Sequence, residues 1–566
     1  MRLRLPLARR LRPTELQTTL FWAGLVGVLG ACAAVAFQEG TQAVQRLFWG
    51  TSGELVDSAA TFPGWLRVLV PVAGGFAAGL VLEAGKRWAR GQTSTDYMEA
   101  VLGEGTIRVR PTLAKSGSSL LSIASGGSIG REGALVQLAG MLASWLGRHR
   151  NFSRPRLKLI VACGAAAGIA AAYNSPLTGA LFVAEILLGS IAMESLGPLV
   201  VASVMATVTT RQILGEGPRF HVRSFALVSP WELGPYLALG AVLGLLAPWF
   251  VRLLHGSERA FRATRLPVPA RLALGGLVVG LFALRWPEVF GNGAASVNSF
   301  LQAGWGWNAL LLVLGAKLVA TVATVGSGAV GGVFTPTLFT GAGLGYLAGL
   351  PLHRLWPTAT AEPSAYALVG MAAFLAGTTQ SPLMAMTIVF EMTLDYGTVL
   401  PLMLACVAAY FASSGSGASS IYAQALARKN GRLAARTVSE LIKLDVVRVK
   451  PQTTFGELVD YFHHHRHNWV YVVDPDGRFL GGVSLHDIKQ HMGEQALAGL
   501  VIASELLHED MPFVSMGETL TRALEQFLHH DGDRLPVLSD PREKKLVGSL
   551  AKNDLLLSLA DQQTGL

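Results

Sequence analysis

The sequence is short of charged residues and of cysteine. Only 15% of its 566 residues are Asp, Glu, Lys or Arg, whereas 51% are hydrophobic, and the mean hydropathy is +0.42. Soluble globular domains carry about 25% charged residues, so this composition excludes an ordinary soluble enzyme. Apolar runs recur from Leu20 to Ser414 and then stop. We therefore predict an all-α polytopic membrane domain followed by a soluble C-terminal module.

Three further absences narrow the class of function. The three cysteines, Cys32, Cys163 and Cys406, all lie in apolar stretches, and their spacing gives neither a disulfide framework nor a metal site. The chain has no HExxH motif, which an intramembrane zinc protease would need. The net charge of +9 is not gathered into a basic stripe with interleaved aromatic residues, so it does not indicate a nucleic-acid partner. We predict a protein that is not an enzyme and holds no metal.

Positive charge is instead concentrated at the N-terminus. An excess of Lys and Arg marks the cytoplasmic side of a membrane protein, so residues 1–17 are predicted to be cytoplasmic and the protein to lie in the inner (plasma) membrane. The run Thr18–Phe37 is predicted to be an uncleaved first helix, although Leu29–Cys32 resembles a lipoprotein cleavage box, because many more spans follow. Five arginines precede the first acid, Glu15: Arg2, Arg4, Arg9, Arg10 and Arg12.

Apolar helix candidates follow one another as far as residue 413. Several are too short to cross about 30 Å of hydrocarbon, and others are long enough to hold two pieces. Gly and Pro interrupt many of them, and broken helices are allowed at membrane depth where they line a polar cavity or are buried in protein. The candidates are residues 18–37, 64–86, 115–147, 157–190, 194–214, 231–255, 270–286, 307–325, 333–353, 364–378, 382–395 and 400–413.

Two halves of the membrane domain repeat each other. Residues 115–140 align without a gap with residues 317–342, at an offset of 202, and Glu132 falls opposite Phe334. In transporters built from repeats the ligand lies near the midplane of the membrane, where the halves meet. The repeats are predicted to cover about residues 64–214 and 270–413.

A second stretch of the repeat carries one acid in each half. Residues 164–186 align with residues 370–392 at an offset of 206, and Glu185 falls opposite Glu391. Acids within a membrane usually mark a pathway or a pairing site. We nevertheless predict that both carboxylates are structural and bonded to backbone groups at helix ends. A cation transporter, which would present these carboxylates to its pore, stays an alternative that a comparison of anion and cation flux discriminates.

The stretch SGGSIGREGA, residues 125–134, combines charge with glycine inside an apolar segment. Its glycines let the backbone approach a ligand closely. The helix predicted to follow, residues 134–146, would direct its free N–H groups and positive dipole end at this turn, which favours a bound anion beside the titratable Glu132. The alternative is a helix-packing turn in which Arg131 and Glu132 are merely paired. The second half offers a matching helix start at GGVFTP, residues 331–336.

Three ordered motifs resemble those of one family. GREGA at residues 130–134 is similar to GREGP, GSGAVGGVFTP at 326–336 is similar to GSGxxGGxFxP, and SIYAQAL at 420–426 is similar to the segment with a pore tyrosine in the CLC family of chloride channels and chloride/proton exchangers. The resemblance implies an inverted-repeat membrane domain over residues 18–426. It also implies a homodimer in the lipid bilayer with one chloride pathway in each subunit.

The resemblance also implies roles for particular residues. Glu132 matches the gating glutamate, whose carboxylate competes with the anion for one position and leaves it when protonated. The backbone amides of Arg131, Glu132 and Gly133 would bind an outer anion, and those of Val333 and Phe334 a central one. The Tyr422 hydroxyl would donate to the central anion, and the alternative for Tyr422 is an anchor at the membrane interface.

The family's first motif, GSGIP, is absent from this chain. In its place stands Gln92–Tyr97, which is similar to the TDYMEA segment of a bacterial branch of the family, the ClcB-like proteins. A hydroxyl from Thr93, Ser94 or Thr95 would replace the missing pore serine. Asp96 is an additional acid in this segment, and we predict that it caps the helix through residues 98–102 rather than serving the anion path.

A second departure concerns proton coupling. In the exchangers two adjacent acids follow the NxPLxGxLF run, and the second acid relays protons from the inner side. Here Glu185 matches the first acid and Ile186 the second, and an isoleucine carries no proton. Protons therefore reach Glu132 by water or another group, or the protein is a passive chloride conductor, and the sequence leaves both possibilities open.

The C-terminal region contains a repeat of its own. Residues 449–462 resemble residues 514–527, and GGVSLHDI at 481–488 resembles GSLAKNDL at 548–555. Each copy has the pattern helix, strand, helix, strand, strand, helix, which resembles a tandem pair of α/β CBS domains. The predicted organisation is a linker at residues 427–435, a first CBS domain at 436–495 and a second at 503–566.

The tail contains two kinds of candidate ligand site. The G-x-x-[ST]-x-x-D element is intact in the first copy with Ser484 and Asp487, whereas the second keeps Asp554 but has Ala551 in place of the hydroxyl. The aspartates would hold a ribose, so regulation by an adenine nucleotide and a pair that binds nothing both stay open. A histidine cluster is predicted to be a solvated helix end that can confer pH sensitivity, with a metal site as the alternative. It comprises His463, His464, His465 and His467, with His529 and His530 in the second copy.

Overall fold

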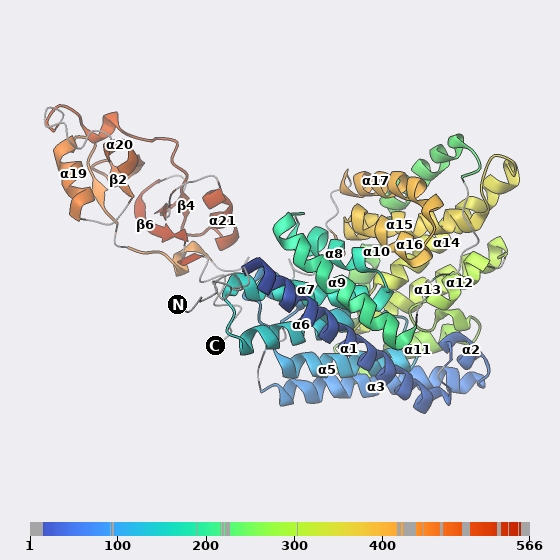
Figure 1. The fold of residues 1–566 in the computed structure, drawn as a ribbon. Helices are drawn as coiled ribbons and strands as arrows, with labels where there is room; N and C mark the ends of the chain where they lie inside the picture. Colours follow the sequence, from blue (N-terminus) through green and yellow to red (C-terminus); the bar gives the residue numbers. More distant parts are fainter. Residues whose placement is uncertain are drawn as a thin grey trace, which may run out of the picture. The chain divides into compact units, whose positions relative to one another are not determined.

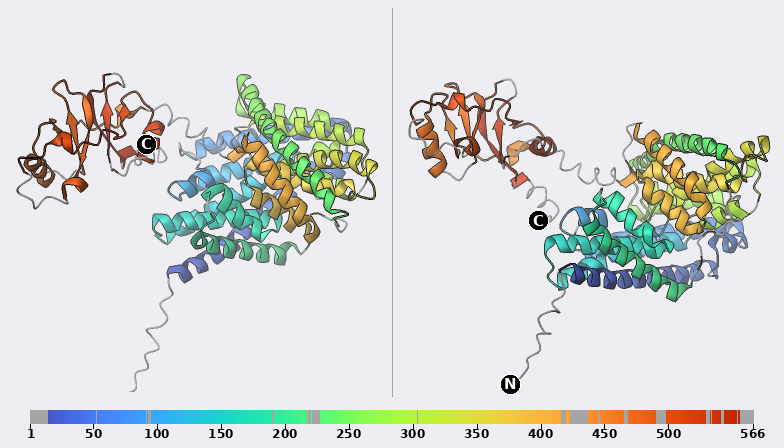
Figure 2. Two further views of the ribbon diagram at one scale, coloured as in Figure 1. Left: turned by 90° about the horizontal axis from the view of Figure 1, so that it is seen from above. Right: turned by 45° about the horizontal axis from the view of Figure 1, so that its top comes forward.

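The computed structural model shows two compact units, Met1–Gln424 and Ala425–Leu566, each of which is described by itself (Figures 1 and 2). The structure describes the chain except for residues 1–14, 52, 91, 93–94, 190, 216, 218–219, 221–226, 303, 416–419, 423–436, 445, 465–467, 490–497, 529–531, 533, 541–542, 553 and 556–566.

The first unit consists of helices only, among the residues that the structure describes. Seven of these helices are long and apolar enough to cross a membrane: α1, α3, α7, α9, α10 with the turn before it, α13, and α17 with the turn before it. The prediction of an all-α polytopic membrane domain is thereby confirmed. The helices of the first half are α1 (Glu15–Trp49), α2 (Leu55–Ala60), α3 (Gly64–Trp88), α4 (Tyr97–Leu102), α5 (Val109–Ala124), α6 (Glu132–His149), α7 (Arg154–Tyr173), α8 (Pro176–Phe182) and α9 (Met193–Leu214).

The second half repeats this series. One short 3₁₀ turn, η3 (Pro230–Glu232), precedes it, and another, η4 (Pro287–Val289), lies within it. Its helices are α10 (Leu233–Ala263), α11 (Val268–Ala283), α12 (Ala294–Gln302), α13 (Trp307–Ser327), α14 (Phe334–Leu355), α15 (Pro363–Thr379), α16 (Pro382–Thr393) and α17 (Val399–Gly415), with the 3₁₀ turn η5 (Tyr396–Thr398) before α17.

The long apolar runs are broken where the sequence indicated that they hold two pieces. The run 115–147 is divided into α5 and α6 by a loop in which Gly126 has φ +109°, a conformation that L side chains rarely adopt. In the second half, Gly328 occupies the matching place with φ +94°. The expected start of α6 at residue 134 is wrong by two residues, because the helix begins at Glu132 and so includes the acid in its first turn.

The run 157–190 is broken at Asn174, a left-handed residue after α7. The chain then forms α8 and continues directly into η2 (Val183–Leu188), one turn of π-helix. Its counterpart α16 continues as an ordinary α-helix to Thr393. The π turn is thus a difference between the two halves, and such turns are often found at functional sites.

Equivalent helices of the two halves pack closely against each other. A Cβ atom on Gly75 of α3 would lie 2.5 Å from the Leu272 carbonyl oxygen of α11, and one on Gly276 of α11 would lie 2.1 Å from the Pro71 carbonyl oxygen of α3. Small residues of this kind allow helix backbones to approach within a membrane. The reciprocal contact is what a two-fold relation between the halves produces.

Glu185 and Glu391 show the same reciprocity. The Glu185 carboxylate accepts hydrogen bonds from the backbone N–H groups of Leu383 (3.2 Å) and Met384 (2.8 Å) in the first turn of α16. The Glu391 carboxylate accepts from the N–H groups of Leu177 (2.9 Å) and Thr178 (2.8 Å) in the first turn of α8, and from the Thr178 hydroxyl (2.6 Å). These contacts confirm the prediction that both acids bond to backbone at helix ends.

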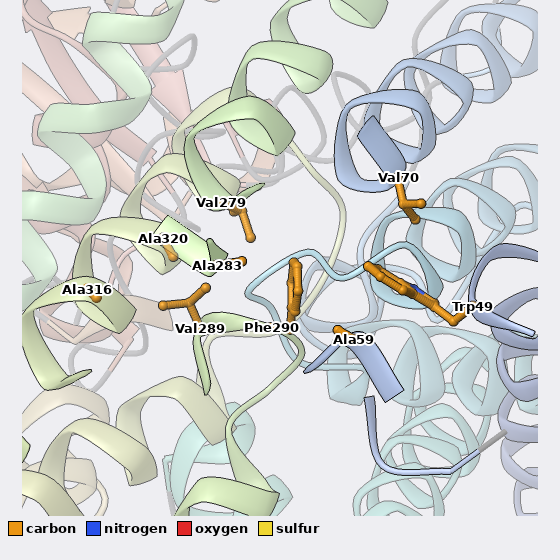
Figure 3. Packing of buried hydrophobic residues seen from close by; sticks show 9 residues of the cluster. All are labelled: Trp49, Ala59, Val70, Val279, Ala283, Val289, Phe290, Ala316 and Ala320. Carbon is orange, nitrogen blue, oxygen red and sulfur yellow. The ribbon is translucent and has the colours of Figure 1, made fainter. Parts of the chain in front are cut away.

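A cluster of buried apolar side chains lies behind the loop before α6 (Figure 3). Trp49, at the end of α1, packs edge-on against Phe290 with ring centroids 5.4 Å apart, and its indole N–H donates to the Ala124 carbonyl at 3.1 Å. Phe290 in turn packs on Gly126, where a Cβ atom would lie 2.7 Å from the ring. The cluster therefore fixes the loop from its rear side. Its buried members are Trp49, Ala59, Val70, Val279, Ala283, Val289, Phe290, Ala316 and Ala320.

The second unit contains two three-stranded sheets of the same topology. In each, the first strand pairs parallel with the second and the second antiparallel with the third, and an irregularity in register follows Val472 in one sheet and Val537 in the other. The predicted α/β tandem is thus confirmed. The elements of the first copy are η6 (Val438–Glu440), β1 (Arg448–Val449), α19 (Phe455–His464), β2 (Trp469–Val473), β3 (Phe479–Ser484) and α20 (Leu485–Lys489). Those of the second copy are η8 (Ala503–Glu505), β4 (Val514–Ser515), α21 (Leu520–Leu528), β5 (Arg534–Leu538) and β6 (Leu546–Ala551).

Candidate anion site

The amino ends of α6 and α14 meet at two equivalent glycines. The Gly130 N–H donates to the Gly332 carbonyl at 2.7 Å, and the Gly332 N–H donates to the Gly130 carbonyl at 2.8 Å. Gly130 and Gly332 are separated by the repeat offset of 202 residues, so the pseudo-two-fold axis of the domain passes between them. The first N–H groups of a helix have no partner within it, and two sets of them are therefore brought to one place.

Glu132 lies at this junction. Its side chain is only 4% exposed, and its Oε1 atom accepts a hydrogen bond from the Thr335 hydroxyl in the first turn of α14. Its Oε2 atom is folded back over the two glycines. A Cβ atom built on Gly130 would lie 1.9 Å from Oε2, and one built on Gly332 would lie 2.6 Å from Oε2. A side chain at either position would have to displace the carboxylate from this place.

The Oε2 atom of Glu132 is buried without a hydrogen-bond partner among the described residues. A buried carboxylate oxygen without a partner is unfavourable, and such groups in native structures call for a functional explanation. Here one oxygen of the acid is held by Thr335 while the other is not. The carboxylate is thus placed between two helix ends without being fully bound there.

Tyr173, the last residue of α7, completes the surroundings of the carboxylate. Its hydroxyl lies 3.1 Å from Thr335 Oγ1, and its ring lies 5.4 Å from the ring of Phe334. Tyr173 and Thr335 are 4% and 2% exposed. Neither residue was a predicted site residue, and the only sequence signal was that Thr335 lies inside the GGVFTP motif.

The loop before α6 is braced by polar groups as well as by the apolar cluster. Ser128 contacts α13 twice, from its hydroxyl to that of Thr321 (2.9 Å) and from its N–H to the Thr324 hydroxyl (3.2 Å). Lys317, which is 1% exposed, donates to the carbonyls of Val289 (2.8 Å), Phe290 (3.2 Å) and Gly291 (2.7 Å). The segment 289–291 that supports Gly126 is therefore itself fixed by a buried ammonium group.

Arg131 lies beside two polar cavities. Cavities of about 330 and 450 Å³ share Gln38, Glu54, Arg131 and Ala294 in their walls, and the larger one also contacts Tyr173. One wall of the smaller cavity is a polar stripe on α1. The expected end at residue 37 is too early, because the apolar run stops there while the helix continues to Trp49. Beyond residue 37 the polar residues Gln38, Thr41, Gln42 and Gln45 lie on one face of the helix, toward the cavity.

The structure places Tyr422 in the same neighbourhood. Its ring packs edge-on against Phe182 with centroids 5.8 Å apart, and Phe182 lies 6.5 Å from the ring of Tyr97. The Tyr422 hydroxyl lies near the carboxylates of Glu132 and Asp96. Tyr422 is half-buried among aromatic side chains of the membrane unit.

The segment that replaces the missing first motif is held by Gln137 of α6. The Gln137 side chain accepts from the Tyr97 N–H (2.9 Å) and donates to the Thr95 carbonyl (2.8 Å). Thr93 and Ser94 lie outside the described residues. Asp96 is the N-cap of α4 and accepts from the Met98 N–H at 3.2 Å, within a capping box completed by Glu99, so the prediction of a capping role is confirmed.

Comparison with known proteins agrees with this geometry. The family profile described as voltage gated chloride channel matches residues 74–414. The chain belongs to the CLC family. The family is one of chloride channels and transporters. A CBS domain profile matches residues 438–494 and 503–561, which identifies the tail as a CBS pair.

Individual CLC relatives cover the membrane unit. A ClcB-like chloride channel protein of Ralstonia nicotianae is 50% identical over 411 residues, which are 72% of this chain and 96% of that protein. The voltage-gated ClC-type chloride channel ClcB of Escherichia coli is 40% identical over 412 residues, 72% of this chain and 98% of that protein.

Solved structures of the family share the fold. A slow cyanobacterial Cl⁻/H⁺ antiporter superposes with a TM-score of 0.65 at 25% identity, covering 73% of this chain and 98% of its own. A eukaryotic CLC transporter superposes with a TM-score of 0.64 at 19% identity over 95% of this chain and 97% of its own.

In the CBS pair, both candidate ribose aspartates contact basic side chains. Asp487 lies 2.7 Å from His508 Nε2, and Asp554 lies 2.6 Å from Lys443 Nζ. Lys443 and His508 hold matching places in the two copies, since the Lys443 backbone pairs with Ser549 and the His508 backbone with Gly482. The Ser484 hydroxyl accepts from the His486 N–H at 3.0 Å.

The predicted histidine cluster is only partly within the described residues. His463 is exposed near the end of α19, whereas His465, His467, His529 and His530 lie outside the description. No group of three potential metal ligands is found among the residues that the structure describes.

Proposed function

We propose that this chain moves chloride across a membrane through one anion pathway per subunit of a homodimer, with the Glu132 carboxylate as the gate. The observation that carries the proposal is the position of that carboxylate between the amino ends of α6 and α14. Helix amino ends favour anions, so a carboxylate and a chloride compete for the same place. Protonation removes the charge of the carboxylate and with it the attraction to the helix amino ends, which couples opening to pH.

The other predicted site residues are assigned from their place around this junction. The amides of Arg131, Glu132 and Gly133 would hold an anion at the α6 end, and those of Val333 and Phe334 at the α14 end. The Tyr422 hydroxyl would donate to the inner of the two. Arg131, in the wall of both polar cavities, would draw anions toward the site from that side.

The decisive experiment measures chloride flux into liposomes reconstituted with the purified chain, as a function of pH. Glu132→Ala is expected to give flux that no longer depends on pH. Glu194→Ala, which removes an exposed carboxylate at the start of α9, is the matched control and should behave as the unaltered protein. Retention of normal pH dependence by Glu132→Ala would refute the gating role.

Proton coupling has two candidate forms. Passive conduction is favoured by Ile186, which cannot carry a proton, and by the engagement of the neighbouring Glu185 in capping α16. Antiport is favoured by the similarity to a solved Cl⁻/H⁺ antiporter. Liposomes loaded with a chloride gradient at zero membrane potential separate the two forms, because an antiporter drives protons uphill and a passive conductor does not.

The CBS pair is proposed to regulate transport through an adenine nucleotide held by Ser484 and Asp487, with Asp554 in the less complete second site. With residues 1–17 and the CBS pair in the cytoplasm and the membrane unit in the plasma membrane, the nucleotide would act from the cytoplasmic side. Mass measurement of the purified protein in detergent tests the homodimer, and protease accessibility in oriented vesicles tests the cytoplasmic placement of the tail.

A further inference from the structure

Three buried side chains from three helices form a chain of oxygen atoms that ends on the proposed gate. Tyr173 at the end of α7, Thr335 in the first turn of α14 and Glu132 in the first turn of α6 are 4%, 2% and 4% exposed. The Tyr173 hydroxyl lies 3.1 Å from Thr335 Oγ1, and Thr335 donates to Glu132 Oε1.

The direction of these hydrogen bonds follows from the number of hydrogens. A hydroxyl has one hydrogen to donate and an ionised carboxylate has none, so the Thr335 hydrogen points at Glu132. Because the only hydrogen of Thr335 is already donated to Glu132, the Tyr173 hydroxyl donates its hydrogen to Thr335 Oγ1. The two hydroxyls thus form a relay of hydrogen bonds that ends on the carboxylate. Such bonds to an ionised acceptor are the strong ones.

The donors belong to the protein and stay in place when the carboxylate leaves. Thr335 is the second residue of α14, so its hydroxyl stands beside the free N–H groups at the start of that helix. The buried Oε2 atom of Glu132 has no hydrogen-bond partner among the described residues, so the carboxylate is only partly hydrogen-bonded in this position. The larger polar cavity reaches the site through Tyr173, which lies in its wall.

This hydroxyl pair has no counterpart at the equivalent described positions of the other half, although the scaffold is duplicated. At the repeat offset of 202 the counterpart of Thr335 is Gly133, and at the offset of 206 the counterpart of Tyr173 is Thr379, whose hydroxyl donates instead to the Leu375 carbonyl of its own helix at 2.7 Å. The pair is therefore not required by the fold.

We propose that the Thr335 hydroxyl, supported by Tyr173, adds a side-chain donor to the position for which the Glu132 carboxylate and chloride compete, and that this hydroxyl binds the carboxylate in the closed state and the chloride ion once the carboxylate has left. The inference rests on the proposed gating role of Glu132. Two consequences follow. The hydroxyls stabilise the ionised gate, so they set the pH at which flux begins. They also donate to the ion itself, so they favour compact anions over large, weakly hydrated ones such as thiocyanate.

The test uses chloride binding by the purified full chain, measured by isothermal titration calorimetry in the Glu132→Ala background, where no carboxylate competes. Adding Thr335→Val, which keeps the shape but removes the hydroxyl, is expected to weaken chloride binding roughly tenfold. Thr335→Ser, which keeps the hydroxyl, should stay within about twofold. Thr340→Val is the matched control, since its hydroxyl bonds only to the Pro336 carbonyl of the same helix.

With Glu132 intact, Thr335→Val should move the midpoint of the pH dependence of flux to higher pH, because the ionised gate loses a donor. Tyr173→Phe should shift it less in the same direction, and the thiocyanate-to-chloride flux ratio should rise in both variants. Equal chloride affinity in Glu132→Ala with and without Thr335→Val, in proteins that elute as the unaltered chain on size exclusion, would overturn this role of the Thr335 hydroxyl. Failure of Glu132→Ala to abolish pH dependence would overturn the gate instead, so the two ideas fail separately.

Discussion

Glu185 and Glu391 each cap the helix that carries the other. Their carboxylates accept N–H groups from the first turns of α16 and α8, at matching distances of 2.8 Å to Met384 and to Thr178. The resemblance to the exchangers of this family implies a proton-carrying acid directly after Glu185, whereas this chain has Ile186 there. Because Glu185 is committed to a helix end, it is poorly suited to take over that task.

The first prediction follows from this exchange of caps. Glu391→Ala leaves three donors of α8 without a partner, and it should lower the free energy of unfolding by about 2 kcal/mol. Glu185→Ala should have a similar but smaller effect, because two donors are affected. Thermal unfolding of the detergent-purified protein, followed by size exclusion, measures both. Loss of the pH dependence of flux at an unchanged melting temperature would indicate that these acids act as a proton relay.

The second prediction uses the space that Gly130 leaves for the Glu132 carboxylate. A Cβ atom at this position would lie 1.9 Å from Glu132 Oε2, so Gly130→Ala should expel the carboxylate. Flux at alkaline pH should then rise to about the level seen at acid pH, as if the gate were absent. Gly117→Ala in α5 is the control, because its nearest neighbour would be 3.6 Å away. If Gly130→Ala keeps the ordinary pH dependence, the closed position of the carboxylate described above is wrong.

The third prediction separates the helix-capping role of Asp96 from the effect of its negative charge. Asp96→Ala should lose about 1 kcal/mol of stability, whereas Asp96→Asn should be nearly neutral, since Asn is as good an N-cap as Asp. Both variants remove the same negative charge near Tyr422. If the pH dependence or anion selectivity of Asp96→Asn differs from that of the unaltered protein, Asp96 serves the anion path in addition to capping the helix.

The fourth prediction concerns the CBS pair. Calorimetry of the full chain with ATP should show one nucleotide per chain, bound in the first copy, where Ser484 and Asp487 are both present. Asp487→Ala should abolish binding and Asp554→Ala should leave it intact. His508→Ala should tighten binding by up to about fivefold, because the nucleotide must displace the hydrogen bond between His508 and Asp487, which is worth about 1 kcal/mol. Equal losses in Asp487→Ala and Asp554→Ala would contradict this assignment.

Much of the fold follows from local signals in the sequence. The repeat offset, the glycine-rich starts of α6 and α14 and the structural role of Glu185 and Glu391 were all predictable, because a duplicated motif shows which residues are equivalent. The tail was predictable for the same reason. The exact start of α6 was not, since the first turn of a helix differs little in sequence from the loop before it.

The hydroxyl pair beside the Glu132 carboxylate could not be predicted. Tyr173 and Thr335 are 162 residues apart, and neither residue type is unusual at the end or the start of an apolar helix. Their contact depends on how α7 and α14 approach across the two halves, which no single motif encodes. The π turn η2 was missed as well, because it differs from the equivalent stretch of α16 by backbone hydrogen bonding rather than by hydrophobic pattern.

The glycine pair on the pseudo-axis has a final consequence. The backbones of the two halves pair symmetrically at Gly130 and Gly332, but the side chains around them differ, and the first half has an acid, Glu132, where the second half has Phe334. Two identical halves would present the same barrier to an ion arriving from either face, and current would be symmetric in voltage. With a carboxylate on one side of the axis and a phenyl ring at the equivalent position on the other, we expect rectification, a sidedness that the side chains impose on a symmetric backbone.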